Sequence, residues 1–196
     1  MKKGYTTHDL RLAYSEIGVR YGSTVYITGD LGRLGFMASD ISQGRVRNKE
    51  TVLDLHVSIL EECVGPNGNI VFPTHSWGLI RTDLCFDPNL TPADYTLSEY
   101  IRTHRDYVRQ MHPYSSVAAV GPEAHDLIPS RLYRHPYGLD TPFDYLTRAN
   151  ALYVSLGLPV SQAISAVHHC ELVAGVPYRY TKAFKQPCLI DGIIRE

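Results

Sequence analysis

The feature that most constrains the fold is a long amphipathic helix placed between two short apolar runs. Residues 48–64 carry their apolar side chains on one face, as a helix packed on one side requires. The Gly-Pro-Asn-Gly sequence at residues 65–68 ends this helix and turns the chain into the apolar run at residues 69–72. Residues 23–28 form a similar, β-branched run that ends at Gly29. The pattern predicts two strands with a helix between them.

Further helix and strand signals alternate along the chain. The apolar period predicts a helix at residues 7–19, capped by Thr7. The segments that follow residue 72 are predicted as a helix (98–108), a strand (116–120), a helix (122–128), a strand (151–157) and a helix that carries His168. Interleaved helices and short apolar strands indicate an α/β fold, a three-layer α/β/α sandwich with a mixed central sheet. The expected central strands are residues 25–28, 70–72 and 152–156.

Composition indicates one globular domain that spans residues 1–196. The chain is 44% hydrophobic and 20% charged, and it is long enough to bury a substantial core. It has 19 Lys and Arg against 20 Asp and Glu, without a long run of either sign, which argues against nucleic acid or a membrane surface as a partner. The 14 tyrosines suit the wall of a polar-ligand cleft or a contact between copies in a homo-oligomer.

The cysteines and the N-terminal residues point to the cytoplasm. The four cysteines are widely separated and lack CxxC or zinc-finger spacing, so we expect reduced thiols and no metal site. The N-terminal residues contain no apolar signal core, and no stretch approaches transmembrane length. These features predict a cytoplasmic protein.

One histidine and one glutamate have the spacing of a catalytic pair. His168 and Glu171 lie three positions apart on the last predicted helix, so their side chains share a face. A carboxylate that orients an imidazole and stabilises its protonated form can make the histidine a base near neutral pH. Such pairs are also common as surface neighbours, so the spacing alone leaves both interpretations open. His169 faces away from Glu171, as a packed or surface histidine does.

Five segments carry a resemblance to a known family. In chain order they are residues 64–76, which include Pro-Thr-His-Ser, 86–88 (Phe-Asp-Pro), 112–119 (His-Pro-Tyr-Ser-Ser-Val-Ala-Ala), 136–143 (Pro-Tyr-Gly-Leu-Asp-Thr-Pro-Phe) and 165–179. Together they resemble the aminoglycoside (antibiotic) N-acetyltransferase family, which transfers acetyl from acetyl-CoA to an amino group of an amino sugar. The resemblance implies acetyl-CoA as co-substrate, a small-molecule amine as acceptor, and direct transfer without a covalent acyl-enzyme.

The resemblance also implies roles for individual side chains. His168 is then the general base that removes a proton from the amine, and Glu171 holds its ring. The segment that begins at His112 lines the cleft in the family, which points to His112 as catalytic and to Ser116 as a coenzyme A contact. His112 precedes a proline and equally suits a turn histidine that is satisfied by the backbone. Ser165 stands where the family usually has threonine, and N-capping of the helix explains it at least as well.

Three loop residues are candidate substrate contacts. Asp87 and Asp140 are carboxylates suited to charge-assisted hydrogen bonds with a cationic amino sugar, although Asp140 also fits a turn former. His75 begins a polar loop that is too long for a plain connection. A ligand contact and a structural role in the loop are both open for His75. Tyr178 and Arg179 are likewise open between packing and ligand binding.

The segment after the first strand departs from the family pattern. The family usually has His-Ser-Ser-Leu there, whereas this chain has Thr28, Gly29, Asp30 and Leu31, followed by Gly32 and Arg33. Glycine amides and the Arg33 side chain can still approach a phosphate, so we expect the coenzyme A phosphates here. The negative charge of Asp30 counts against an anionic cofactor. The Gly-Lys-Ser/Thr ending of a P-loop is missing.

Two functions are compatible with the sequence. The first is an N-acetyltransferase acting on an aminoglycoside or on a sugar amine of a cell-surface polysaccharide precursor. The second is a non-catalytic homologue that kept the fold to bind a sugar or a protein partner. The histidine–glutamate pair favours the enzyme, and the altered segment after the first strand favours the homologue. The chain is also shorter than the family leads us to expect, so C-terminal elements are expected to be absent or supplied by a partner chain.

Overall fold

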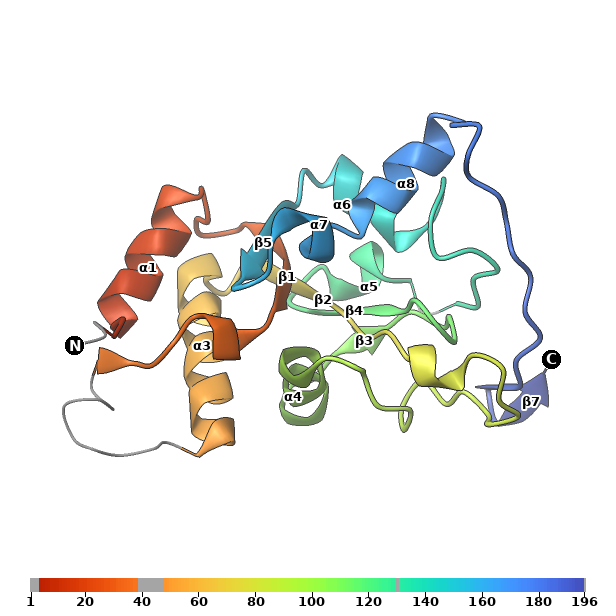
Figure 1. Ribbon diagram of the computed structural model, residues 1–196, viewed down its shortest axis with the longest axis horizontal. Coiled ribbons are helices and arrows are strands. Elements are labelled where there is room, and N and C mark those ends of the chain that lie inside the picture. The colour runs from red at the N-terminus through yellow and green to blue at the C-terminus, as the bar shows by residue number, and fades with distance from the viewer. Residues whose placement is uncertain (1–3, 39–47, 130, 196) are drawn as a thin grey trace.

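The computed structural model describes residues 4–38, 48–129 and 131–195. Its central strands are β1 (Thr24–Gly29), β2 (Asn69–Pro73), β3 (Val108–Arg109), β4 (Val117–Val120) and β5 (Leu152–Leu156). They form one sheet in the order β3-β4-β2-β1-β5 (Figure 1). β1 is parallel to β2 and β5, whereas β4 is antiparallel to β2 and β3. The sheet is therefore mixed, as predicted.

Helices cover both faces of this sheet. One face packs against α1 (Thr7–Glu16), α3 (Lys49–Val64) and α4 (Thr96–His104), and the other against α5 (Ala124–Leu127), α6 (Pro142–Arg148) and the start of α8 (Ala166–Val173). Alternate residues of β2 enter the two apolar layers, Phe72 the first and Val71 the second, and both are wholly buried. The predicted α/β class and the three layers are confirmed. Within the described ranges, no helix is long and apolar enough to cross a membrane.

Capping residues fix the ends of the two long helices. α3 begins after Asn48, whose side chain accepts a backbone N–H of the first turn, and it ends at Gly65, whose φ of 67° suits glycine. The cap of α1 is Thr6, so the prediction of Thr7 is wrong. Thr6 Oγ1 accepts the N–H of Asp9 while the Asp9 carboxylate accepts the N–H of Thr6, and these reciprocal bonds favour the earlier position.

The prediction of one helix over residues 98–108 is only partly correct. α4 ends at His104, and Val108 and Arg109 form β3 instead, because they pair with Ala119 and Ala118 of β4. Such pairing depends on residues that are distant in sequence, so local periodicity does not report it. The periodicity also gives no prediction for α6, although proline at its first position is a known helix-start signal.

The last strands lie apart from the main sheet. A short helix, α7 (Val160–Ala163), precedes α8, and a long segment then runs along the outside of the molecule to β6 (Cys188–Ile190) and β7 (Ile193–Arg195) (Figure 1). β6 and β7 form a hairpin whose turn residues, Asp191 and Gly192, both have positive φ, as a tight two-residue turn requires.

The ends of β2 and β4 place several predicted site residues side by side. β2 leads directly into Thr74 and His75, and the start of β4 lies beside them because the two strands are antiparallel. The N–H of Thr74 donates to the carbonyl of Ser116 at 2.8 Å, and the N–H of Ser76 donates to the carbonyl of Tyr114 at 3.0 Å. The loop after β2 is thereby joined to the loop before β4.

Candidate active site

The predicted pair on α8 meets, but a third side chain lies between its members. His168 Nδ1 is 3.7 Å from Glu171 Oε2. Arg179 Nε donates to that same oxygen at 2.6 Å, and Arg179 Nη2 contacts His168 Nδ1. The hydroxyl of Tyr178 donates to Glu171 Oε1 at 3.1 Å. The helical spacing thus correctly places His168 beside Glu171, and Arg179 and Tyr178 complete a four-residue group.

The charges of this group favour a neutral histidine beside an ionised carboxylate. Burial, followed by the positive charge of Arg179, lowers the pKa of His168, and Glu171 only partly opposes this effect. Hydrogen bonding from Arg179 lowers the pKa of Glu171. The ring of Tyr137 meets the ring of His168 edge-on, with 5.3 Å between their centroids. A neutral imidazole can accept a proton near pH 7 at whichever ring nitrogen is unprotonated and free.

His75 is a buried histidine whose ring makes no hydrogen bond to the described residues. It is 4% exposed, and neither ring nitrogen has a partner there. Its ring packs edge-on against Trp77 and Tyr95, at centroid distances of 5.4 and 5.7 Å. Burial lowers its pKa to about 4, and positive charge on His112, His168 and Arg109 adds to the effect. His75 therefore has two ring nitrogens to offer to water or a ligand.

His112 caps the turn that precedes β4. Its Nδ1 accepts the backbone N–H groups of Tyr114 at 3.2 Å and of Ser115 at 3.1 Å. This is the geometry of the turn-histidine alternative. Because Nδ1 is an acceptor, the neutral ring carries its proton on Nε2. Burial, followed by the charge of His135, lowers the pKa of His112 to about 4, so the ring is neutral at physiological pH.

A buried arginine that the sequence analysis does not single out organises the loop after β2. Arg109 donates from Nε to the hydroxyls of Thr74 and Ser116, at 3.1 and 3.2 Å. Burial lowers its pKa to about 10. Ser116, predicted to contact coenzyme A, is wholly buried inside this network. The other acceptors of Arg109 are Ser76 Oγ and the carbonyls of Thr74, Pro88 and Thr91. All of them are uncharged.

The predicted phosphate-binding loop follows β1, and its residues hydrogen-bond to one another. The Asp30 carboxylate accepts the N–H of Gly32 at 3.2 Å and Arg33 Nε at 3.0 Å, so its charge is locally compensated. A Cβ at Gly29 would lie 2.9 Å from the Cβ of Leu156, so close strand packing explains this glycine. Leu31 packs partly against the first apolar layer. The hydroxyl of Thr28 is buried and makes no hydrogen bond to the described residues.

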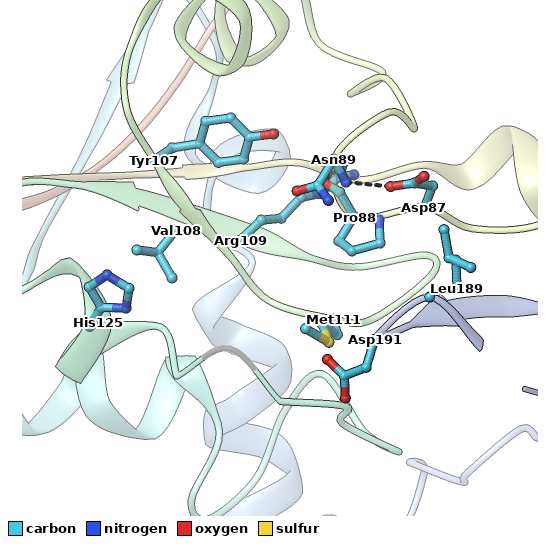
Figure 2. A pocket seen from close by; sticks show the side chains of 11 residues that line it. Asp87, Pro88, Asn89, Tyr107, Val108, Arg109, Met111, His125, Leu189 and Asp191 are labelled. Atoms are coloured by element: carbon cyan, nitrogen blue, oxygen red, sulfur yellow. Dashed lines mark hydrogen bonds between the residues drawn. The ribbon is translucent and has the colours of Figure 1, made fainter. Parts of the chain in front are cut away.

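The two predicted substrate carboxylates lie in separate loops. Asp87 Oδ1 accepts the N–H groups of Asn89 and Leu90, at 2.7 and 3.1 Å. Asp87 lines a cavity of about 390 Å³ together with Asp191 (Figure 2). His75, His112 and His168 are not among the residues that line it. Asp140 has a positive φ of 55°, and its carboxylate is 4.0 Å from Arg148. Neither carboxylate bonds to His75, His112 or His168 within the described chain.

His169 and Ser165 lie close to His168 in the sequence, and the sequence leaves a structural role open for each. His169 is 4% exposed, and its Nδ1 accepts the N–H of Gly138 at 3.2 Å, which agrees with a packed histidine. Ser165 occupies the N-cap position of α8, but its side chain makes no capping hydrogen bond. The prediction of a capping serine is therefore not confirmed at this helix.

Comparison with known proteins identifies the family of the chain. The family model described as Aminoglycoside 3-N-acetyltransferase matches residues 41–193. Aminoglycoside N(3)-acetyltransferase IX of Micromonospora chalcea is 26% identical over 204 residues, which cover 94% of this chain and 66% of that protein. The chain therefore spans about two thirds of the length of this relative.

Solved structures share the fold. A structure of sisomicin-bound AAC-VIa superimposes with a TM-score of 0.80 at 25% identity, covering 98% of this chain and 74% of that one. The structure of AAC-IIIb with CoASH has the same TM-score and coverage at 20% identity, a likeness of fold alone. Because the family model covers most of the sequence, the chain belongs to the aminoglycoside 3-N-acetyltransferase family.

Proposed function

We propose that this protein is an acetyl-CoA-dependent N-acetyltransferase that acetylates an amino group of an amino sugar. The observation that carries the proposal is the placement of His168 beside Glu171 on α8, with 3.7 Å between His168 Nδ1 and Glu171 Oε2. Family membership and the names of the relatives, which include sisomicin-bound and CoASH-bound proteins, support the acetyl donor and the class of acceptor. The activity is a proposal for this chain, because the chain spans only part of the relative's length.

In this proposal His168 is the general base. Nε2, on the ring edge away from Glu171, takes a proton from the substrate ammonium and frees its lone pair to attack the acetyl carbonyl carbon. The carbon–nitrogen bond forms as the carbon–sulfur bond breaks. His168, which has released the first proton to solvent, then removes a second proton from the attacking nitrogen and passes it to the leaving thiolate. Acetyl-CoA supplies the acetyl group as a reactive thioester. Glu171 stabilises the imidazolium, and the lowered pKa keeps the resting ring neutral.

His112 and His75 contribute neutral rings to the same reaction. The proton on Nε2 of His112 makes that atom a donor for the acetyl carbonyl oxygen, on which negative charge develops. The nitrogens of His75, which have no hydrogen-bond partner among the described residues, bind a hydroxyl or amine of the acceptor. Ser116, which is wholly buried, acts on coenzyme A only indirectly, by holding the loop with Arg109.

The loop after β1 holds the cofactor phosphates. Arg33 is half-exposed, and its partner Asp30 compensates its charge, so phosphate binding exchanges one anionic partner of Arg33 for another. Once Asp30 turns away, the freed N–H of Gly32 points to the phosphate. The buried hydroxyl of Thr28, which makes no hydrogen bond to the described residues, is a further donor beside Gly29 and Leu31.

The acceptor is an aminoglycoside or a sugar amine of a cell-surface polysaccharide precursor. Asp87 and Asp140 are the proposed contacts for its amino groups. Asp87 lines its cavity, and the Asp140 carboxylate is largely exposed near Arg148. An acceptor with several amines would use both carboxylates, whereas a single amine needs only the histidine group.

A non-catalytic homologue is the alternative function. The observation that favours it is the set of hydrogen bonds that the Asp30 carboxylate accepts. They come from the N–H of Gly32 and from Arg33, the two donors that a phosphate would need. Such a protein would bind an amino sugar or a protein partner through the same fold.

Calorimetry with acetyl-CoA, followed by a thiol-release assay, separates the two functions. The acceptor panel contains a multi-amine aminoglycoside and an amino sugar with one amine. We expect heat with acetyl-CoA, and thiol release that depends on the acceptor. Amino-sugar binding without any response to millimolar acetyl-CoA would support the homologue and reject the enzyme.

A further inference from the structure

The direct partner of the proposed base is an arginine. Arg179 Nη2 contacts His168 Nδ1, whereas the nearest oxygen of Glu171 is 3.7 Å away, beyond normal hydrogen-bond distance. The same guanidinium donates from Nε to Glu171 Oε2 at 2.6 Å. Tyr178 holds the second oxygen of Glu171 at 3.1 Å. Arg179 thus bridges His168 and Glu171, which in a simple histidine–glutamate pair would hydrogen-bond to each other directly.

A guanidinium determines which nitrogen of a neighbouring neutral imidazole carries the proton. Arginine only donates hydrogen bonds, so the nitrogen that it contacts must be the acceptor. Nδ1 of His168 is then unprotonated, and the single ring proton sits on Nε2. No hydrogen bond from the described residues reaches Nε2. A ring in this form donates from Nε2 and cannot take a proton there.

We propose that Arg179 is a positioning residue that decides which nitrogen of His168 carries the proton. With Arg179 on Nδ1 the ring rests in the Nε2–H form. When Arg179 releases Nδ1, the ring proton moves from Nε2 to Nδ1, and the Nδ1–H group donates a hydrogen bond to Glu171. Nε2 is then unprotonated and can act as the base. The inference deepens the proposed function, because it concerns the same histidine. Glu171 is already placed for the exchange, since its Oε2 lies 3.7 Å from Nδ1.

The groups around His168 give the expected direction of its titration. Arg179 opposes protonation of the ring, and Glu171 favours it. Tyr137 faces the ring edge from the loop before α6, and His75 interacts with it electrostatically. Removing the guanidinium therefore raises the pKa of His168 and frees Glu171 to accept from Nδ1.

Nitrogen-15 NMR of histidine-labelled protein tests the proposal without turnover. His168→Gln assigns the ring signals, which are measured above the pKa of His168. We expect the proton on Nε2 in the wild type and on Nδ1 in Arg179→Met, with a higher His168 pKa in that variant. Tyr178→Phe removes the other partner of Glu171 and should leave the proton on Nε2. Arg11→Met, which removes a remote Arg–Glu pair between α1 and α3, is the matched control.

A wild type with the proton on Nδ1 would overturn the inference, as would an Arg179→Met protein with unchanged tautomer and pKa. The wild-type measurement decides the matter even where the variant folds poorly. In an active protein, Arg179→Met should move the acid limb of the kcat/KM profile to higher pH and keep kcat on the alkaline plateau. An equal loss of kcat at every pH would mean a merely structural role. Wild type without acetyl-CoA binding rejects the proposed function and leaves the NMR result intact.

Discussion

Two consecutive histidines on α8 have opposite environments. The side chain of His168 is 45% exposed and belongs to the charged group with Glu171, whereas His169 is 4% exposed and accepts the N–H of Gly138. The difference follows from helical geometry, because adjacent positions point about 100° apart. The exposed histidine is thus the proposed base, and the buried histidine next to it packs against the loop that contains Gly138.

Substitution of each histidine should expose this difference. His168→Ala should reduce acetyl transfer by roughly two to four orders of magnitude, the usual contribution of a positioned base. Glu171→Gln should cost less, because the geometry remains. His169→Ala should instead lower the free energy of unfolding by about 1–3 kcal/mol, because it leaves a buried N–H unpaired. Steady-state rates and urea titrations measure the two effects. A larger loss of kcat in His169→Ala would contradict the assignment.

Acid should destabilise the protein through its buried histidines. The pKa values of His75 and His112 are about 4 in the folded protein, against 6.5 ordinarily. Between these values the unfolded chain binds protons that the folded chain does not, so stability falls as pH falls from 6.5 towards 4. Each ring contributes on the order of 3 kcal/mol across this range.

His75→Phe tests that contribution. The variant should be as stable as wild type or more stable at pH 7, because His75 makes no hydrogen bond to the described residues that the substitution could remove. Its unfolding free energy should also depend less on pH. Urea titrations at pH 7 and pH 4.5 provide the comparison. An unchanged pH dependence would show that His75 is protonated in the folded protein.

Sequence spacing could identify His168 and Glu171 because both stand on one helix, where spacing fixes direction. It could not place Arg179 between them, because the position of Arg179 depends on how the chain folds back after α8. The burial of His75 is likewise set by the packing of Trp77 and Tyr95 around it. The contacts that set the protonation and burial of these histidines are therefore mostly ones that sequence spacing does not determine.

At the scale of elements, Arg109 on β3 ties the loop after β2 to the loop before β4. Its guanidinium meets uncharged acceptors in three separate segments. Arg109→Met should lower the free energy of unfolding by about 2–4 kcal/mol, because several buried carbonyls and hydroxyls lose their donor. Arg109→Lys should restore little, because one ammonium cannot span them.

Urea titration measures the loss at Arg109, and Arg11→Met is again the control. Arg11 makes an exposed ion pair with Glu62, so its loss should cost less than about 1 kcal/mol. Equal effects of the two substitutions would mean that the buried network contributes no more than a surface pair.

The elements themselves show what local sequence determines. α3 and β2 lie within a residue or so of their predicted bounds, because Asn48, Gly65 and a strong apolar period are local signals. β3 is a strand only through its pairing with β4, so a helical pattern leading into it was misleading. Contacts distant in sequence override propensity there.

At the scale of the molecule, one sheet carries two apolar layers. Phe72 is wholly buried in the layer with α3, and Phe143 is wholly buried in the layer with α6. Phe72→Ala and Phe143→Ala should each lower the unfolding free energy by about 3–5 kcal/mol. Because β2 contributes to both layers, each variant should still unfold in one transition. Calorimetry and circular dichroism check this, and two separate transitions would mean that the layers fold independently.

The surroundings of His75 have a practical consequence. Trp77 is the single tryptophan of the sequence, it is 45% exposed, and its ring lies 5.4 Å from that of His75. All indole fluorescence of the protein therefore originates beside the candidate site. A ligand that reaches His75 changes the polarity around this fluorophore, so an unlabelled sample reports its own occupancy through the intensity and wavelength of its emission.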